Sequence, residues 1–154
     1  MKATAHLTGK SLTNTVEMGK HQLTVDEPVD RGGTDEGPCP QELLAASLAS
    51  CTAITIAMYA RRKGWDLGAF DVSVDYTPAE RGCPTRFRLE LQLPAGCTDE
   101  QRERLQVIAA KCPVHRTLEG DVMFEDRVTV APAATAGAPA PRSEERSRLS
   151  LIRN

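Results

Sequence analysis

The chain has 154 residues, of which 40% are hydrophobic and 26% are charged, and its formal net charge is −2 at pH 7. This length fits one domain with a tail, and the mixed charges leave no basic stripe for binding nucleic acid. Aromatic residues make up only 4% of the chain, too few for a platform on which bases stack. The composition therefore excludes a nucleic-acid-binding module and indicates a small globular protein.

The N-terminus, MKATAHLTGK, lacks the apolar segment that signal peptides carry. The longest uncharged run, residues 43–60, just reaches the length of a membrane span, but serine, threonine and cysteine interrupt it. Five cysteines form an odd set, which argues against a disulfide framework. We therefore expect a cytoplasmic protein that does not enter the membrane, with residues 43–60 inside a buried helix.

Three short strands are predicted at the start of the chain, over residues 3–8, 13–18 and 21–26. Glycine turns separate them, and polar and apolar residues alternate within them, as in an antiparallel meander. Residues 27–39 are rich in glycine, proline and acidic residues. They are predicted to form a long loop, and loops of that length are often functional.

A long helix is predicted to begin at Pro40 and to end before Gly64. Proline suits the first helical position, and glycine commonly follows the last one. Residues 61–63 are all basic, which suits the negative end of the helix dipole. Because this helix is apolar on every face, it needs burial on every face. We infer a homodimer in which two such helices pack together between two sheets.

Two strands and a second helix follow. Residues 70–76 and 86–93 alternate strictly, as strands do. Thr98 and Gln101 have the spacing of a capping box at the start of the second helix. The strands and helices are segregated along the chain, so the fold class is α+β.

The last predicted elements are a short helix over residues 113–119 and a final strand over 122–130. From residue 131 the composition becomes rich in alanine and proline and then charged. Such a segment cannot build a core of its own. The predicted organisation is one domain over residues 1–130 with a flexible extension over 131–154.

The cysteines are the candidates for chemistry, and their local sequence does not choose among them. Cys51 lies inside the long helix, where a thiol usually packs without reacting and burial raises its pKa. Cys112 precedes Pro113 and would cap the short helix, where the helix dipole favours a thiolate. Cys39 and Cys83 also precede prolines.

A zinc site is a weaker alternative. Cys112 and His115 have the spacing of metal ligands, and Cys51 or His21 could complete the set. No second pair of cysteines or histidines with ligand spacing is present. We therefore expect neither a metal nor a bound cofactor.

Two segments carry a resemblance to a known family. Residues 32–51, GGTDEGPCPQELLAASLASC, resemble the signature of the OsmC / organic hydroperoxide resistance family, in which a glycine- and proline-containing loop leads into a helix bearing a cysteine. Residues 111–115, KCPVH, are similar to the family's second cysteine motif, and a looser match covers residues 1–130. The resemblance implies about six antiparallel strands wrapped on the central helix. It also implies an intertwined homodimer with two active sites at the subunit interface.

The resemblance further implies an antioxidant peroxidase of the oxidative stress response. Cys51 would attack an organic hydroperoxide and become a sulfenic acid. Cys112 would then condense with it to form a disulfide. An external dithiol, of lipoyl type in the best-known members, would reduce that disulfide by thiol exchange.

One position departs from the family pattern. The characterised peroxidases carry a glutamate directly after the proline, held to an arginine that activates the thiolate, whereas this chain has Gln41. At about 100° per residue, Gln41 lies about 80° from Cys51 around the helix, and Glu42 lies on the opposite side. The candidates for the activating cation are Lys10 and Arg31.

Gln41 slightly favours a second function, in which the same dimer binds an apolar or thiol-reactive small molecule without peroxidase turnover.

Overall fold

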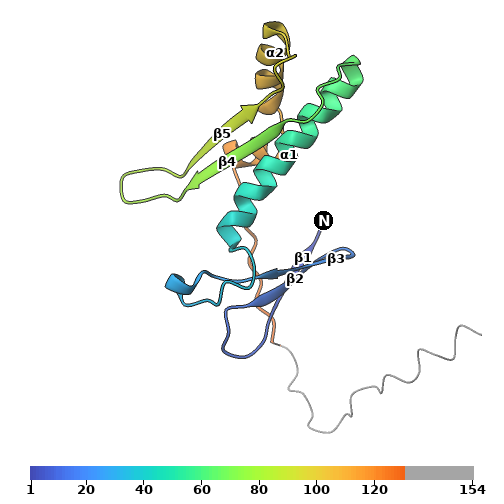
Figure 1. Ribbon diagram of the computed structural model, residues 1–154. Helices are drawn as coiled ribbons and strands as arrows, with labels where there is room; N and C mark the ends of the chain where they lie inside the picture. Colours follow the sequence, from blue (N-terminus) through green and yellow to red (C-terminus); the bar gives the residue numbers. More distant parts are fainter. Residues whose placement is uncertain (131–154) are drawn as a thin grey trace, which may run out of the picture. The chain divides into compact units, whose positions relative to one another are not determined.

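The computed structural model describes residues 1–130 (Figure 1). The predicted extension at 131–154 lies outside the described residues. A first unit, Met1–Val122, contains all the helices and strands described below, and a second unit begins at Met123.

The predicted meander is present at the start of the chain. Strands β1 (Ala3–Leu7), β2 (Asn14–Met18) and β3 (His21–Val25) form an antiparallel sheet in the order β1-β2-β3. Val16 on β2 lies opposite Leu23 on β3, and both side chains are partly buried. The alternation seen in the sequence therefore corresponds to two faces of a real sheet.

The predicted loop between β3 and the long helix follows a fixed course. It contains one turn of 3-10 helix, η1 (Val29–Arg31). A Cβ atom on Gly33 would lie 1.7 Å from the Glu27 carbonyl oxygen, and one on Gly37 would lie 2.3 Å from the Thr24 carbonyl oxygen. Only glycine permits these close backbone approaches, which fold the loop back on the end of β3.

The Asp26 carboxylate organises this loop. Asp26 is 1% exposed, and its oxygens accept hydrogen bonds from the backbone N–H groups of Glu27, Thr34 and Glu36 and from the Thr34 hydroxyl, over 2.7–3.3 Å. The Thr34 hydroxyl is the largest influence, and together these donors hold the pKa of Asp26 well below its usual range.

The long helix has the predicted bounds. Helix α1 (Pro40–Lys63) begins after Cys39, whose backbone N–H donates to Glu42 Oε2 at 2.8 Å. It ends at Gly64, which adopts the left-handed conformation with φ 69°. Both ends are therefore closed by local interactions of the kind that stop helices.

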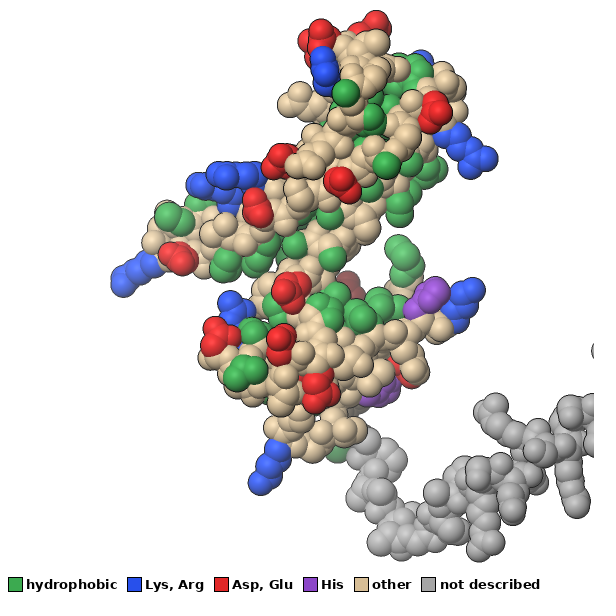
Figure 2. All heavy atoms as spheres, in the orientation of Figure 1, with side chains coloured by type: hydrophobic (Ala, Val, Ile, Leu, Met, Phe, Trp, Pro, Cys, Tyr) green, Lys and Arg blue, Asp and Glu red, His purple; other side chains and the backbone are tan. Residues whose placement is uncertain are grey.

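Helix α1 was expected to be buried on every face, but in the single chain part of its apolar surface is exposed. Its buried residues, Leu48, Thr52, Ile56, Tyr59 and Ala60, occupy one side. The apolar stripe residues Leu44, Met58 and Ile54, which lie beside and beyond that side, are 36%, 68% and 59% exposed. Figure 2 shows hydrophobic side chains at the surface of the molecule. α1 is long and apolar enough to cross a membrane by length and composition, a test that core helices of soluble proteins also pass.

Strands β4 (Asp71–Thr77) and β5 (Arg86–Gln92) form an antiparallel hairpin, with Val74 opposite Leu89. Their side chains alternate between exposed and partly buried along each strand. The partly buried face carries the apolar residues, and β4 lies against α1 (Figure 1). The hairpin therefore covers part of the buried side of α1.

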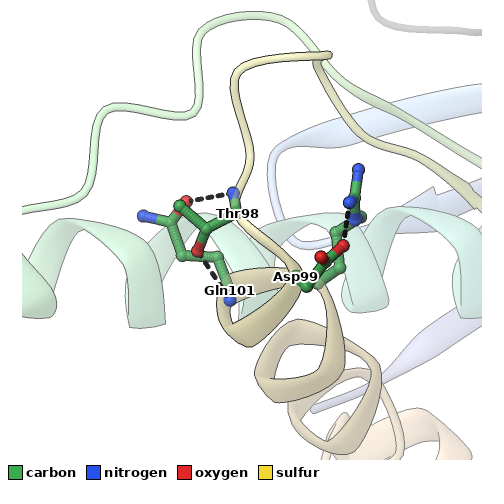
Figure 3. A network of polar contacts seen from close by, with 4 residues as sticks. Thr98, Asp99 and Gln101 are labelled. Carbon is green, nitrogen blue, oxygen red and sulfur yellow. Dashed lines mark hydrogen bonds and ion pairs between the residues drawn. The ribbon is translucent and has the colours of Figure 1, made fainter.

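Helices α2 (Asp99–Ala109) and α3 (Pro113–Glu119) complete the first unit, and both pack against α1. The predicted capping box of α2 is confirmed (Figure 3): the Thr98 N–H donates to Gln101 Oε1 at 2.9 Å, and the Gln101 N–H donates to Thr98 Oγ1 at 3.2 Å. Leu105 of α2 is fully buried in the core cluster that includes Ile56 of α1. This cluster fixes the far half of α1 against α2.

The predicted strand over residues 122–130 is wrong for the single chain. The described residues contain five strands in two sheets, rather than about six in one, and 122–130 belongs to none of them. A strand needs a neighbouring edge for its backbone hydrogen bonds, and none of the described strands pairs with this segment. Its apolar side chains are exposed, with Phe124 at 83% and Val128 at 93%.

Replacing Asp26 by asparagine tests the role of its charge. Because the pKa of Asp26 is lowered by folding, its stabilisation is complete above the unfolded value of about 3.9 and is lost as the pH falls below it. We expect Asp26→Asn to lower the melting temperature at pH 7. Between pH 5 and pH 2, the melting temperature of the variant should fall less than that of the wild type. Hydrogen exchange should quicken at the Thr34 and Glu36 amides. Asp30→Asn, in the same loop, is the control, and identical exchange in both variants would contradict the assignment.

Candidate functional site

Two thiols that lie far apart in the sequence meet where α3 packs on α1. Cys51 lies near the midpoint of α1, and Cys112 is the N-cap residue of α3. The two thiols lie close enough for each to shift the pKa of the other, and neither is in a disulfide. This pair is the candidate functional site.

The surroundings of Cys112 favour its thiolate. The residue is fully buried, and burial alone raises the pKa of its thiol. Four polar neighbours act against burial, namely the Cys51 thiol, the N–H groups of His115 and Val114, and the Thr52 side chain, and the net direction of the Cys112 pKa is downward. The predicted position of Cys112 at the start of a helix is thus confirmed, although its side chain accepts no capping hydrogen bond.

Cys51 has the opposite tendency. It is partly buried, and burial followed by the hydrogen bond with Cys112 raises the pKa of its thiol. The Val114 N–H and the Thr55 side chain oppose this rise without reversing it. Among the described residues, no lysine or arginine is a main influence on the Cys51 pKa. In the single chain Cys51 therefore favours the neutral thiol beside Cys112.

His115 lies beside the pair but contacts it through its backbone. Its ring Nε2 lies 3.1 Å from Glu119 Oε1, and its buried Nδ1 has no hydrogen-bond partner among the described residues. The ring lines a groove of 720 Å³ between β5 and α2, together with Leu91 and Gln106. The His115 N–H, rather than the imidazole, therefore acts on Cys112.

A second group of predicted site residues gathers at the start of α1. Arg31, Gln41 and Glu42 line one cavity of 460 Å³ with Cys39. Arg31 Nη1 lies 3.8 Å from Glu27 Oε2, and Glu42 is engaged in capping α1. Gln41, unlike Glu42, has no part in the cap.

Within one chain, the residues at the start of α1 lie apart from the pair of thiols. Gln41 and Cys51 are separated by about 15 Å along the helix axis, at 1.5 Å per residue. Lys10 lies exposed in the turn between β1 and β2 and does not contribute to the Cys51 pKa. Neither predicted cation therefore activates Cys51 within the described chain.

Sequence reasoning missed Thr52. Leu48, Thr52 and Ile56 form a stripe spaced by four residues, and all three are almost completely buried. A hydroxyl within an otherwise apolar buried stripe next to Cys51 was a signal that could have been found. Among residues 1–130, no cluster of three or more histidine, cysteine or acidic side chains could hold a metal ion.

The family of the chain follows from its sequence and is consistent with this site. A family model described as OsmC-like protein matches residues 33–125, more than half of the chain and a span that includes both thiols. The chain belongs to the OsmC-like protein family. A comparison with curated proteins found no match.

Solved structures resemble this OsmC-like protein in fold. An OsmC-like protein from Mycoplasma pneumoniae is 22% identical, with TM-score 0.65, and the match covers 77% of this chain and 86% of that one. An organic hydroperoxide resistance protein OsmC from Legionella pneumophila is 22% identical, with TM-score 0.60, covering 77% and 88%. One from Elizabethkingia anophelis is 24% identical, with TM-score 0.60, covering 77% and 87%. These similarities confirm the predicted α+β fold of the family.

Replacing Cys112 by serine tests the coupling of the two thiols. The hydrogen bond and the charge of Cys112 both raise the pKa of Cys51, whereas burial, the larger cause, stays. We expect the pKa of Cys51 to fall in Cys112→Ser but to remain above that of an exposed cysteine. The rate of Cys51 alkylation by iodoacetamide, followed by mass spectrometry across pH, measures this change. Cys97→Ser, a buried thiol elsewhere in the core, is the control, and an unchanged or higher midpoint in Cys112→Ser would refute the coupling.

Proposed function

We propose that this OsmC-like protein is a thiol peroxidase that reduces organic hydroperoxides through Cys51 and Cys112. The observation that carries the proposal is the proximity of the two thiols where α3 packs on α1, because one peroxidatic and one resolving thiol must come within reach of a single disulfide. The organic hydroperoxide resistance proteins among the structures of similar fold support the substrate class.

The proposed reaction has two steps. The Cys51 thiolate attacks the terminal oxygen of the hydroperoxide, an S–O bond forms, the O–O bond breaks, and the alkoxide takes a proton to leave as the alcohol. The Cys112 thiolate then attacks the Cys51 sulfur, an S–S bond forms, and hydroxide leaves and is protonated to water. An external dithiol, such as a lipoyl group, reduces the disulfide by exchange and returns both thiols.

The resolving step suits the environment of Cys112. A thiolate is the nucleophile in disulfide formation, and the donors around Cys112 lower its pKa. Cys51 is the more accessible of the two thiols, since it is partly exposed whereas Cys112 is fully buried. The peroxide would therefore reach Cys51 first, and Cys112 would wait behind it as the resolving thiol.

The activating step calls for a second copy of the chain. The Cys51 pKa is raised in one chain, so a positive or polar group must approach from outside to favour its thiolate. Cys51 lies beside the exposed apolar stripe of α1, which includes Ile54 and Met58. We propose that a second copy packs on this stripe and that the partner subunit's Arg31 and Gln41 approach Cys51 there.

The second candidate function, binding without turnover, is favoured by two observations. Gln41 is a neutral amide that cannot act as the carboxylate of characterised peroxidases, and Cys51 has a raised pKa. The dimer would then hold an apolar or thiol-reactive small molecule at Cys51. Intact mass measurement of protein purified without reductant distinguishes the two functions, because a retained adduct on Cys51 favours binding.

We also propose that the protein works in a reducing compartment such as the cytoplasm. All five cysteines are free thiols, and the proposed cycle needs a dithiol reductant to return them to that state.

Serine replacements separate the roles of the two thiols. We expect Cys51→Ser to abolish reduction of cumene hydroperoxide, with a loss of at least about a thousandfold because the nucleophile is gone. Cys112→Ser should allow one turnover and then accumulate oxidised Cys51, which dimedone labels as the sulfenic acid. Consumption of peroxide with a dithiol reductant measures turnover.

Cys83→Ser is the matched control, because Cys83 is exposed and lies in the β4–β5 hairpin away from the pair. It should retain wild-type turnover. Wild-type protein that neither consumes peroxide nor forms a sulfenic acid at Cys51 would overturn the peroxidase proposal.

A charge on the apolar stripe of α1 tests the proposed homodimer. We expect Ile54→Lys to convert a dimer into a monomer in sedimentation velocity at micromolar concentration, because burying an unpaired ammonium in an apolar interface is unfavourable. The rate of peroxide turnover should fall together with the fraction of dimer if the partner activates Cys51. Val107→Lys, at a half-exposed apolar position on α2, should leave the dimer intact. A wild-type protein that sediments as a monomer would rule the dimer out.

A further inference from the structure

The two thiols of the candidate site differ in their access to solvent. Cys112 is 0% exposed, whereas Cys51 is partly exposed. The proposed peroxidase cycle ends when an external dithiol breaks the disulfide between them, and thiol exchange begins at one of the two sulfur atoms. The difference in exposure therefore bears on which sulfur the reductant attacks.

The backbone of Cys112 is held on both sides. Its N–H donates to the Ala109 carbonyl oxygen at 3.2 Å, and its carbonyl oxygen accepts a hydrogen bond from the Arg116 N–H at 3.0 Å. Pro113, the first residue of α3, restricts the backbone directly after it. Bringing Cys112 to the surface would therefore require the start of α3 to leave α1.

Cys51 is open toward the apolar stripe of α1. Leu44 and Met58 lie two turns before and two turns after it, each about 20° away around the helix axis, and they are 36% and 68% exposed. Ser47, one turn before Cys51, is exposed as well. A molecule that approaches along this side of α1 meets the Cys51 sulfur first, and Cys112 lies behind it.

We propose that the external dithiol attacks the Cys51 sulfur and that Cys112 is the leaving group, so that the mixed disulfide forms on Cys51. This assignment rests on the proposed peroxidase cycle. In thiol exchange the attacking, attacked and leaving sulfur atoms lie close to one line. Attack on the Cys112 sulfur would therefore bring the reductant through the core, on the side of Cys112 away from Cys51. Peroxide and reductant would use the same opening at different stages of the cycle.

The exchange balances in two steps. One thiolate of the reductant attacks the Cys51 sulfur, a new S–S bond forms, the Cys51–Cys112 bond breaks, and Cys112 leaves with the electron pair as a thiolate. The second thiolate of the reductant then attacks the reductant's own sulfur in the mixed disulfide and releases the Cys51 thiolate, which takes up a proton. The reductant loses two electrons and the protein gains two. The polar neighbours that lower the pKa of Cys112 suit it as the leaving group, since a thiol of lower pKa leaves faster.

Trapping with a monothiol identifies the attacked sulfur, because a monothiol has no second thiol with which to complete the exchange. Full-length protein is oxidised with diamide, which closes the disulfide without peroxidase activity, mixed briefly with 2-mercaptoethanol, and quenched with N-ethylmaleimide. Fragmentation mass spectrometry should find mercaptoethanol on Cys51 and maleimide on Cys112. Cys83→Ser, which removes an exposed thiol outside the pair, should give the same pattern. Mercaptoethanol on Cys112 would overturn the proposal, as would a failure of diamide to join the two cysteines.

The reaction of each thiol alone with 4,4′-dithiodipyridine separates access from ionisation. Cys112→Ser leaves Cys51, and Cys51→Ser leaves Cys112. In the folded protein we expect Cys51 to react about tenfold faster, because access outweighs the lowered pKa of Cys112. In guanidinium chloride, where both thiols are exposed, the two rates should become similar. A rate at Cys112 equal to or above that at Cys51 in the folded protein would contradict the assignment.

The two proposals fail separately. Wild-type protein without peroxide turnover would lose the peroxidase proposal, yet a mercaptoethanol adduct on Cys51 after diamide oxidation would still identify the attacked sulfur. An adduct on Cys112 in a protein that does consume peroxide would leave the peroxidase proposal standing and overturn the assignment of the leaving group.

Discussion

The contact between the start of α3 and the middle of α1 is the constraint on which the site depends. It places the Cys112 sulfur against Cys51 although the two residues lie far apart in the sequence. The capped ends of α1 and the core cluster around Ile56 and Leu105 keep α1 and α2 in fixed register. Since α3 follows α2 after a short turn, the same packing positions Cys112. The core therefore supplies more than stability, because it holds two thiols within reach of each other.

The pKa of Cys112 is lowered and that of Cys51 is raised, and the places of the two residues in their helices contribute to this difference. Cys112 stands at a helix start, where backbone N–H groups lack helical partners and can point at the sulfur. Cys51 stands inside a helix, where the N–H groups of its own helix are already bonded to carbonyls. One position therefore favours a thiolate and the other a thiol. In the proposed cycle, this difference suits a resolving role for Cys112 and a peroxidatic role for Cys51.

The sequence predicted well what is decided locally. The bounds of α1 follow from Pro40 and Gly64, and the start of α2 follows from Thr98 and Gln101, because these residues act within one helical turn. The strand expected at 122–130 was not formed, because a strand depends on an edge that the alternation of its own residues does not specify. The separation of Gln41 from Cys51 follows from helix geometry, whereas the position of Arg31 depends on how the loop before α1 packs. The pairing of Cys51 with Cys112 was anticipated from family resemblance, not from local chemistry, which left Cys39 and Cys83 equally plausible.

The exposed side of α1 and the raised pKa of Cys51 have a common physical origin in our proposal. Leu44, Ile54 and Met58 leave an apolar stripe open to water, and Cys51 lies at its border without a cation. Covering the stripe would remove water from Cys51 and raise its pKa further, unless the covering surface also carries a charge or a donor. The cavity of Arg31 and Gln41 lies at the end of the same helix. A second copy related by a two-fold axis would apply such a cavity to each stripe, so that association and activation of Cys51 would be one event.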